Sequence, residues 1–269
     1  MVPGLTASPV QTREISVPAH ESPAHTPEFA LPAQTVVPGQ PASPPSGTGN
    51  SVDHRAEACH HHGMQDRIPA RQIRAVHTET TIRVYQAYRP EIADAALAAG
   101  TFVAPFKRER MTWIKPSFLW MAYRCGWGEK PGQERVLALD ITREGFSWAL
   151  ENAALSHFDR TFHVSEQAWR DSVRADPVRI QWDPERDLHH RPLPHRSIQI
   201  GLSGEAVDRY VDSWITGVTD VTPAMHAIRT HLVAGRTTDA EKLLPVETPY
   251  PLPSRLTASI GAHDTGTPH

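Results

Sequence analysis

Apolar and polar residues alternate along several short stretches, and this pattern predicts the strands of a sheet. In residues 81–88 the polar Gln86 shares one face with Ile82 and Val84. Residues 135–141 are almost continuously apolar, which is typical of a strand buried on both faces. We also expect a brief strand at 111–114 and an antiparallel pair at 178–182 and 197–202.

Apolar residues spaced three or four apart predict helices between these strands. The clearest stripe follows the positions i, i+3, i+4 and i+7 and consists of Val207, Tyr210, Val211 and Trp214. Start signals support other helices, because Pro90 suits a first helical position and Ser165 suits an N-cap. We expect helices at 90–99, 117–124, 144–155 and 165–174, and two more that begin near 203 and 222.

The two ends of the chain lack both patterns. Residues 1–65 are rich in Pro, Ser, Thr, Ala and His, and residues 237–269 contain repeated prolines. Such segments bury too little apolar surface to offset their ordering entropy, so we expect two disordered tails. All seven tryptophans fall within the remaining 66–236. We therefore predict one α+β domain there, with a central mixed or antiparallel sheet flanked by helices.

Composition narrows the class of protein. No stretch of 18 apolar residues suggests a membrane span, and no secretory signal pattern opens the chain. Two cysteines give no disulfide framework, so we expect a cytoplasmic protein. The formal net charge of -3 argues against a strongly electrostatic duplex binder. The residues 59–62 (CHHH) could bind a metal, but they lack spaced ligand pairs, so we expect none.

The stretch 110–124 mixes large aromatic rings with cations more densely than any other part of the chain. Rings of this size usually enter a core, whereas Lys and Arg are rarely fully buried without a partner. The mixture suits the wall of a pocket, where Arg110 and Lys115 would hold phosphate. Trp113 or Trp120 would then stack on a base. The alternative is an amphipathic helix whose charges reach the surface.

The two late strands supply the candidate catalytic residues. Their antiparallel pairing places Gln181 and Gln199 on one face, which solvent or a pocket could use. Asp183 and Glu185 could form a carboxylate pair near Gln181. The composition of residues 183–186 (DPER) is also common in turns, which is the structural alternative. No glycine-rich phosphate loop, nucleophile elbow or zinc-protease helix signature is present in the sequence.

Four motifs closely resemble the family of domain of unknown function 4291. They are residues 112–121 (TWIKPSFLWM), 143–146 (REGF), 179–186 (RIQWDPER) and 197–207 (SIQIGLSGEAV). The resemblance spans about 71–233 and implies no activity. It implies the limits of one domain.

The order of elements also resembles that of ADP-ribosyltransferases, which use NAD. By that resemblance Gln86 and Tyr88 at the end of the first strand would help to hold nicotinamide, together with Trp113 and Lys115. A late strand would orient the ribose through residues 179–183, where Gln181 with Asp183 would position the ribose or accept a proton. This sequence lacks the His-Gly or Arg-Gly that the family carries near Gln86, and no Glu stands within 178–182.

The resemblance implies an ADP-ribosyltransferase-like enzyme that acts on a nucleotide or a nucleic acid, with NAD as its cofactor. The same wall of cations and rings would serve a module that binds single-stranded nucleic acid without catalysis. A protein-binding domain with all its aromatic residues in the core is the third interpretation. The three interpretations assign different roles to the same four residues, Arg110, Trp113, Lys115 and Trp120.

Overall fold

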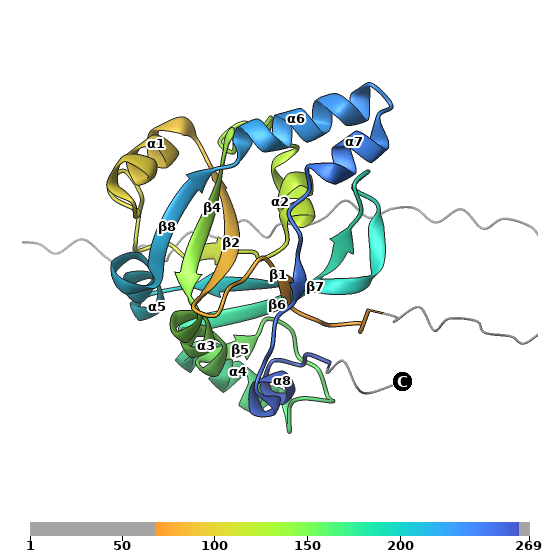
Figure 1. Cartoon of the computed structure of the whole chain (residues 1–269). Helices are drawn as coiled ribbons and strands as arrows, with labels where there is room; N and C mark the ends of the chain where they lie inside the picture. Colours follow the sequence, from red (N-terminus) through yellow and green to blue (C-terminus); the bar gives the residue numbers. More distant parts are fainter. Residues whose placement is uncertain (1–67, 264–269) are drawn as a thin grey trace, which may run out of the picture. The chain divides into compact units, whose positions relative to one another are not determined.

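The computed structural model describes residues 68–263, and these form an α+β domain with two main sheets (Figure 1). The predicted class is confirmed. The first sheet is antiparallel and has the order β2 (Thr81–Tyr88), β4 (Arg135–Thr142), β8 (Ile215–Asp220). The second has the order β3 (Thr112–Ile114), β7 (Pro192–Leu202), β6 (Val178–Arg186), β5 (Ala153–Leu155). Only β5 and β6 run parallel within it.

The largest apolar cluster draws on one face of each main sheet. The first sheet contributes Val84 and Leu139, which lie opposite each other on β2 and β4. The second contributes Ile180 and Ile200, which are paired on β6 and β7. All four are at most 1 % exposed. The alternation that predicted the strands therefore decides which face of each sheet is buried.

A backbone contact joins the two sheets. The Tyr85 backbone N–H donates to the Lys115 carbonyl oxygen at 2.8 Å, which forms a bridge between β2 and the end of β3. Because successive side chains of a strand point to opposite faces, Gln86 and Tyr88 share one side of β2. The bridge brings the end of β2 next to Trp113 and Lys115, which sequence analysis assigned to the same ligand.

Helices follow most of the predicted positions. The N-cap of α2 is Ser117, whose hydroxyl accepts from the Trp120 backbone N–H at 3.1 Å. Ser165 caps α4 in the same way, as predicted. The predicted stripe at 207–214 is split between α5 and a π-helical turn, η1. The helices are α1 (Pro90–Ala99), α2 (Phe118–Cys125), α3 (Arg143–Glu151), α4 (Glu166–Ala175), α5 (Glu205–Arg209), η1 (Tyr210–Trp214) and α6 (Thr222–Val233).

The structure differs from the predicted elements in two places. The helix expected at 144–155 ends at Glu151, and Ala153–Leu155 forms the parallel edge strand β5. Ala153 pairs with Val178 of β6, and this strand pairing outweighs the helical spacing that placed Ala153 in the predicted helix. Strand β8 was not predicted, because only intermediate or exposed residues occupy it and no apolar row marks it.

The predicted C-terminal limit at residue 236 was also wrong. Residues 237–263 contain α7 (Thr237–Lys242), β9 (Thr248–Pro249) and α8 (Ser254–Ser259). Strand β9 pairs with β1 (Arg74–Ala75). Leu256 and Ile260 join the main core at 3 % and 1 % exposure, and the Trp182 indole donates to the Ile260 carbonyl at 2.8 Å. A few well-placed apolar residues suffice to hold this segment, despite its prolines.

The predicted N-terminal tail (1–65) and the candidate metal ligands 59–62 lie outside the described residues. None of the helices between residues 68 and 263 has the length and apolar character that a membrane-spanning helix requires.

Candidate functional site

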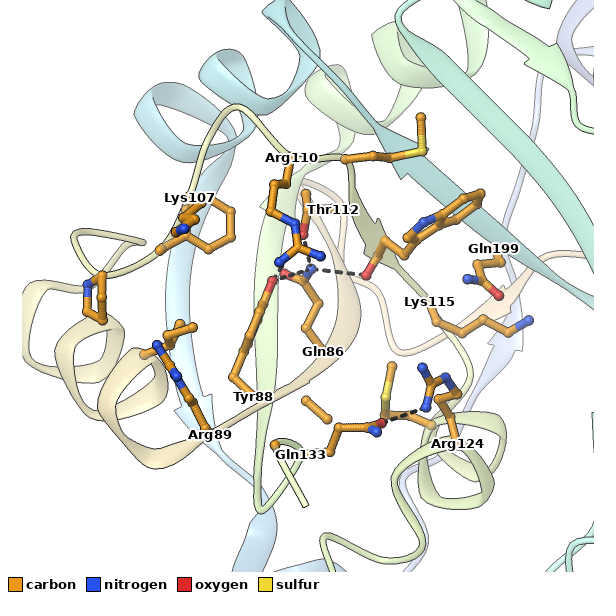
Figure 2. A pocket seen from close by; sticks show the side chains of 18 of the residues that line it. Gln86, Tyr88, Arg89, Lys107, Arg110, Thr112, Lys115, Arg124, Gln133 and Gln199 are labelled. Carbon is orange, nitrogen blue, oxygen red and sulfur yellow. Dashed lines mark hydrogen bonds between the residues drawn. The ribbon is translucent and has the colours of Figure 1, made fainter. Parts of the chain in front are cut away.

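A cavity of about 650 Å³ opens where the end of β2, the start of α1, the segment 105–115 and α2 meet (Figure 2). Its cationic lining consists of Arg89, Lys107, Arg110, Lys115 and Arg124. Its large apolar lining consists of Phe106, Met111, Trp113, Trp120 and Met121. Within the described part of the chain, no Asp or Glu lines this cavity. The lining therefore combines an excess of positive charge with aromatic surface.

Six of the eight predicted site residues line the cavity, and they are Gln86, Tyr88, Arg110, Trp113, Lys115 and Trp120. The other two, Gln181 and Asp183, do not line it. They lie behind Lys115, because Asp183 contacts the Lys115 ammonium and Gln181 contacts Asp183. The structure thus brings all eight into one continuous group, and the roles assigned to them stay predictions.

Gln86 forms the centre of a buried hydrogen-bond network, and only 3 % of the residue is exposed. Its amide nitrogen lies 2.7 Å from the Thr112 hydroxyl and 3.0 Å from the Trp113 carbonyl oxygen. Its amide oxygen accepts from the Tyr210 hydroxyl at 2.8 Å. Since internal partners occupy both ends of the amide, Gln86 ties β2 to β3 and leaves ligand contacts to its neighbours.

Tyr88 completes this network at the surface of the cavity. Its hydroxyl lies 3.0 Å from the Gln86 amide nitrogen and 3.0 Å from the Thr112 hydroxyl. Burial raises the pKa of Tyr88 to about 12, so the phenol stays neutral throughout the physiological range. Tyr88 can therefore exchange hydrogen bonds with a ligand but cannot act as a general base there.

Lys115 is only 1 % exposed, which is unusual for a lysine. Its ammonium lies 3.0 Å from Asp183 Oδ2, 3.3 Å from the Ser197 carbonyl oxygen and 3.9 Å from the centre of the Trp120 ring. Burial lowers its pKa to about 8, and the nearby Asp183 carboxylate limits the fall. At neutral pH the side chain therefore keeps most of its charge.

The carboxylate of Asp183 is occupied on both oxygens. One accepts from the Lys115 ammonium, and the other accepts from the Gln181 amide nitrogen at 2.7 Å. Gln181 stands opposite Gln199 in the β6/β7 register, as the predicted pairing requires. Asp183 therefore fixes Lys115, and its influence on a ligand in the cavity passes through that lysine.

Lys107 and Arg110 carry the accessible charge of the cavity. Both side chains are exposed, and neither makes a hydrogen bond or ion pair with another residue of 68–263. Arg108, which lies between them, points elsewhere and pairs with Asp212 at 2.6 Å. Arg124 donates to Gln133 Oε1 at 2.9 Å, also at the cavity. Lys107 and Arg110 therefore line the cavity, whereas Arg108 of the same segment contacts η1.

Arg89, Phe106 and Gln133 are among the lining residues that sequence analysis did not single out. Gln199 lines the cavity as well, and sequence analysis had placed it with Gln181 on a face that solvent or a pocket could use. Arg89 directly follows the predicted strand that ends at Tyr88. No sequence pattern marks Phe106 or Gln133, because loops bring them to the site.

A second polar cluster, outside the cavity lining, fixes the start of α2. The Ser117 hydroxyl donates to Glu185 Oε1 at 2.9 Å, and the Phe118 backbone N–H donates to Glu247 Oε1 at 2.7 Å. Burial, together with the nearby Glu185 carboxylate, raises the pKa of Glu247 to about 8. Glu247 belongs to the segment predicted as a tail. The C-terminal segment therefore helps to position the helix that carries Trp120 and Arg124.

A family model described as Domain of unknown function (DUF4291) matches residues 72–250. The match covers β1 to β9 and so includes every residue of the cavity. A comparison with curated proteins finds no match.

Proposed function

The chain belongs to the DUF4291 family, whose description names no reaction, and we propose that it binds a phosphate-bearing nucleotide in the cavity between β2 and α2. One observation carries this proposal. Five cations and several aromatic rings line the cavity, and no carboxylate of the described residues does. An anionic ligand with a flat ring would satisfy both features.

The size and charge of the cavity support the same ligand class. A volume of about 650 Å³ falls within the range of roughly 300 to 1,000 Å³ that is typical of small-molecule sites. Lys107 and Arg110 have no partner among residues 68–263, so a phosphate would form charge-assisted bonds without breaking existing ones. Lys115 adds a fixed positive charge held by Asp183.

We further propose that the nucleotide is NAD and that the protein transfers ADP-ribose from it to a nucleotide or nucleic-acid acceptor. The order of elements and the nearness of Gln86 and Tyr88 to Trp113 and Lys115 support this reaction. In it, Asp183 and Gln181 act as positioning residues, because they reach the ligand only through Lys115. The glycosidic bond to nicotinamide breaks, so released nicotinamide is the product to detect.

Arg110→Ala tests nucleotide binding, and Arg108→Ala is its matched control. Arg108 lies two residues away and is paired with Asp212 outside the cavity. We expect isothermal titration of the full chain with NAD and ADP to show binding that Arg110→Ala weakens about tenfold or more. Arg108→Ala should leave it unchanged. Equal affinities in both variants would refute the assignment of the cavity.

The same titrations separate the alternatives. Nicotinamide release from NAD, measured by chromatography, would support the transferase, whereas binding without release would leave a nucleotide-binding protein. If only single-stranded oligonucleotides bind, with a steep dependence on salt, the site is a nucleic-acid module and the proposed nucleotide specificity is wrong. If no nucleotide or oligonucleotide binds, a protein-interaction domain replaces both.

A further inference from the structure

Three glutamines line the cavity, and they differ in what their amide groups already contact. The Gln86 amide is bonded at both ends to internal partners. Gln133 accepts from Arg124. Gln199 is half-buried, and its side chain makes no hydrogen bond to any residue within 68–263. Of the three, Gln199 alone presents both an unused donor and an unused acceptor to a ligand within the described structure.

Trp113 lies beside this free amide, on the same face of the second sheet. Trp113 pairs with Gly201 across β3 and β7, and Gln199 is two residues from Gly201 along β7. Residues two apart on a strand point the same way and are separated by roughly 6.6 Å. The Trp113 ring rests on Gly201, because a Cβ there would lie 2.9 Å from two ring carbons. A base stacked against Trp113 would therefore bring its edge to Gln199.

Gln199 and the accessible cations occupy different ends of the cavity. Figure 2 shows Gln199 on one side, Lys107 and Arg89 on the opposite side, and Arg110 between them. A nucleotide with its phosphates at Arg110 and Lys107 would extend its base toward Gln199. The cations would thus hold the phosphate end of the nucleotide, and the Gln199 amide would contact its base.

We propose that this end of the cavity recognises adenine, with Trp113 as the stacking platform and Gln199 as the residue that reads the base edge. Trp113 then holds the adenine and not the nicotinamide that the ADP-ribosyltransferase resemblance assigns to it. A glutamine amide can donate to an adenine ring nitrogen and accept from the exocyclic amino group at the same time. Guanine would present two adjacent donors on its Watson–Crick edge, which a carboxylate accepts best. No carboxylate of the described residues lines the cavity, so guanine lacks that partner. This inference rests on the proposed nucleotide site.

The test compares the affinities of the full chain for ADP, GDP and nicotinamide mononucleotide, in the wild type and in two variants. Gln199→Leu removes both hydrogen bonds at similar size, and Gln199→Glu replaces the amide donor with a second acceptor. We expect the wild type to prefer ADP to GDP. We expect Gln199→Leu to lower the affinity for ADP about tenfold or more and the affinity for GDP much less, since a good bidentate pair of hydrogen bonds discriminates between bases by roughly that factor.

Gln199→Glu adds a negative charge that weakens every phosphate-bearing ligand, so the ratio of ADP to GDP affinity is the quantity to compare. That ratio should fall about tenfold or more. If the affinities for ADP and GDP fall equally in both variants while Arg110→Ala still weakens nucleotide binding, the nucleotide site stands and adenine recognition is wrong. A loss confined to nicotinamide mononucleotide would also overturn it, because Gln199 would then read the nicotinamide amide. Failure of any nucleotide to bind the wild type would overturn both proposals.

Discussion

The substitution Asp183→Asn probes the buried charge of Lys115. It removes the carboxylate 3.0 Å from the ammonium and keeps a side chain of the same shape that can still accept from Gln181. Without its partner, the ammonium would be a buried and uncompensated charge. We expect the pKa of Lys115 to fall further, so that the side chain becomes neutral at pH 7 in the variant.

The size of the effect follows from the pKa of Lys115. Its ordinary value is 10.5 and its value in the folded protein is about 8, so keeping the charge at pH 7 costs roughly 3 kcal/mol of stability. If the pKa of Lys115 falls below 7 in the variant, the native lysine is neutral at pH 7 while the unfolded one is charged, and the cost rises to roughly 5 kcal/mol. The variant therefore loses roughly 1 to 2 kcal/mol through the charge, and one lost hydrogen bond adds roughly 1 kcal/mol.

The charge contribution should disappear at higher pH. Above about pH 8, Lys115 is neutral in the native state of both proteins, so only the lost hydrogen bond separates them by pH 9. Between pH 8 and 10.5 the unfolded chain binds more protons at Lys115 than the native protein does. The contribution of this residue to stability therefore rises with pH in the wild type, and it begins to rise at a lower pH in Asp183→Asn.

Urea unfolding of the full chain at pH 7 and pH 9, followed by tryptophan fluorescence, measures these differences. Asp212→Asn is the control, because it also removes a carboxylate from an ion pair, but the pair with Arg108 is exposed. We expect that control to change the free energy of unfolding little at either pH. An equal destabilisation of Asp183→Asn at both pH values would refute the reasoning, since the charge of Lys115 would then play no part.

Three further predictions concern other parts of the domain. Glu247→Gln should stabilise the protein increasingly from about pH 5 to pH 8, because the raised pKa of Glu247 makes its ionisation unfavourable in the folded state. The amide oxygen of the new glutamine can still accept from the Phe118 backbone N–H, and urea unfolding across this pH range measures the effect. Gly201→Ala should displace the Trp113 ring and weaken nucleotide binding measured by titration, with native circular dichroism as the control. Truncation after residue 236 should lower the melting temperature or abolish folding, because it uncovers the core around Leu256 and Ile260, and an unchanged melting temperature would contradict this.

Strong local patterns predicted most of the elements. The apolar run in β4 and the N-cap of α4 at Ser165 each fix a local structure without help from distant residues. Strand β5 shows the opposite case, because residues 153–155 fit a helix and become a strand only by pairing with β6. The C-terminal segment was misjudged because its few apolar residues have a partner in the core that composition does not reveal.

The candidate site could be predicted in part, because local sequence patterns mark some of its residues. The stretch around Trp113 and Lys115 was unusual enough to indicate a pocket, because it mixes cations with rings. The partnership of Lys115 with Asp183 spans 68 residues and depends on the pairing of β3, β7 and β6, which no local pattern reports. The occupied amide of Gln86 and the free amide of Gln199 look alike in sequence, and only their neighbours distinguish them.

The pairing of β1 with β9 has a consequence for how this domain can be joined to others. Arg74 lies opposite Pro249, and the His263 backbone N–H donates to the Arg71 carbonyl oxygen at 2.7 Å, so the chain enters and leaves the folded unit at adjacent points. A unit whose entry and exit are adjacent can be placed within a loop of another protein with little distortion of the host. The same closeness makes a circularly permuted version, with new ends cut in an exposed turn, a practical way to move both extensions of this chain away from β1 and β9.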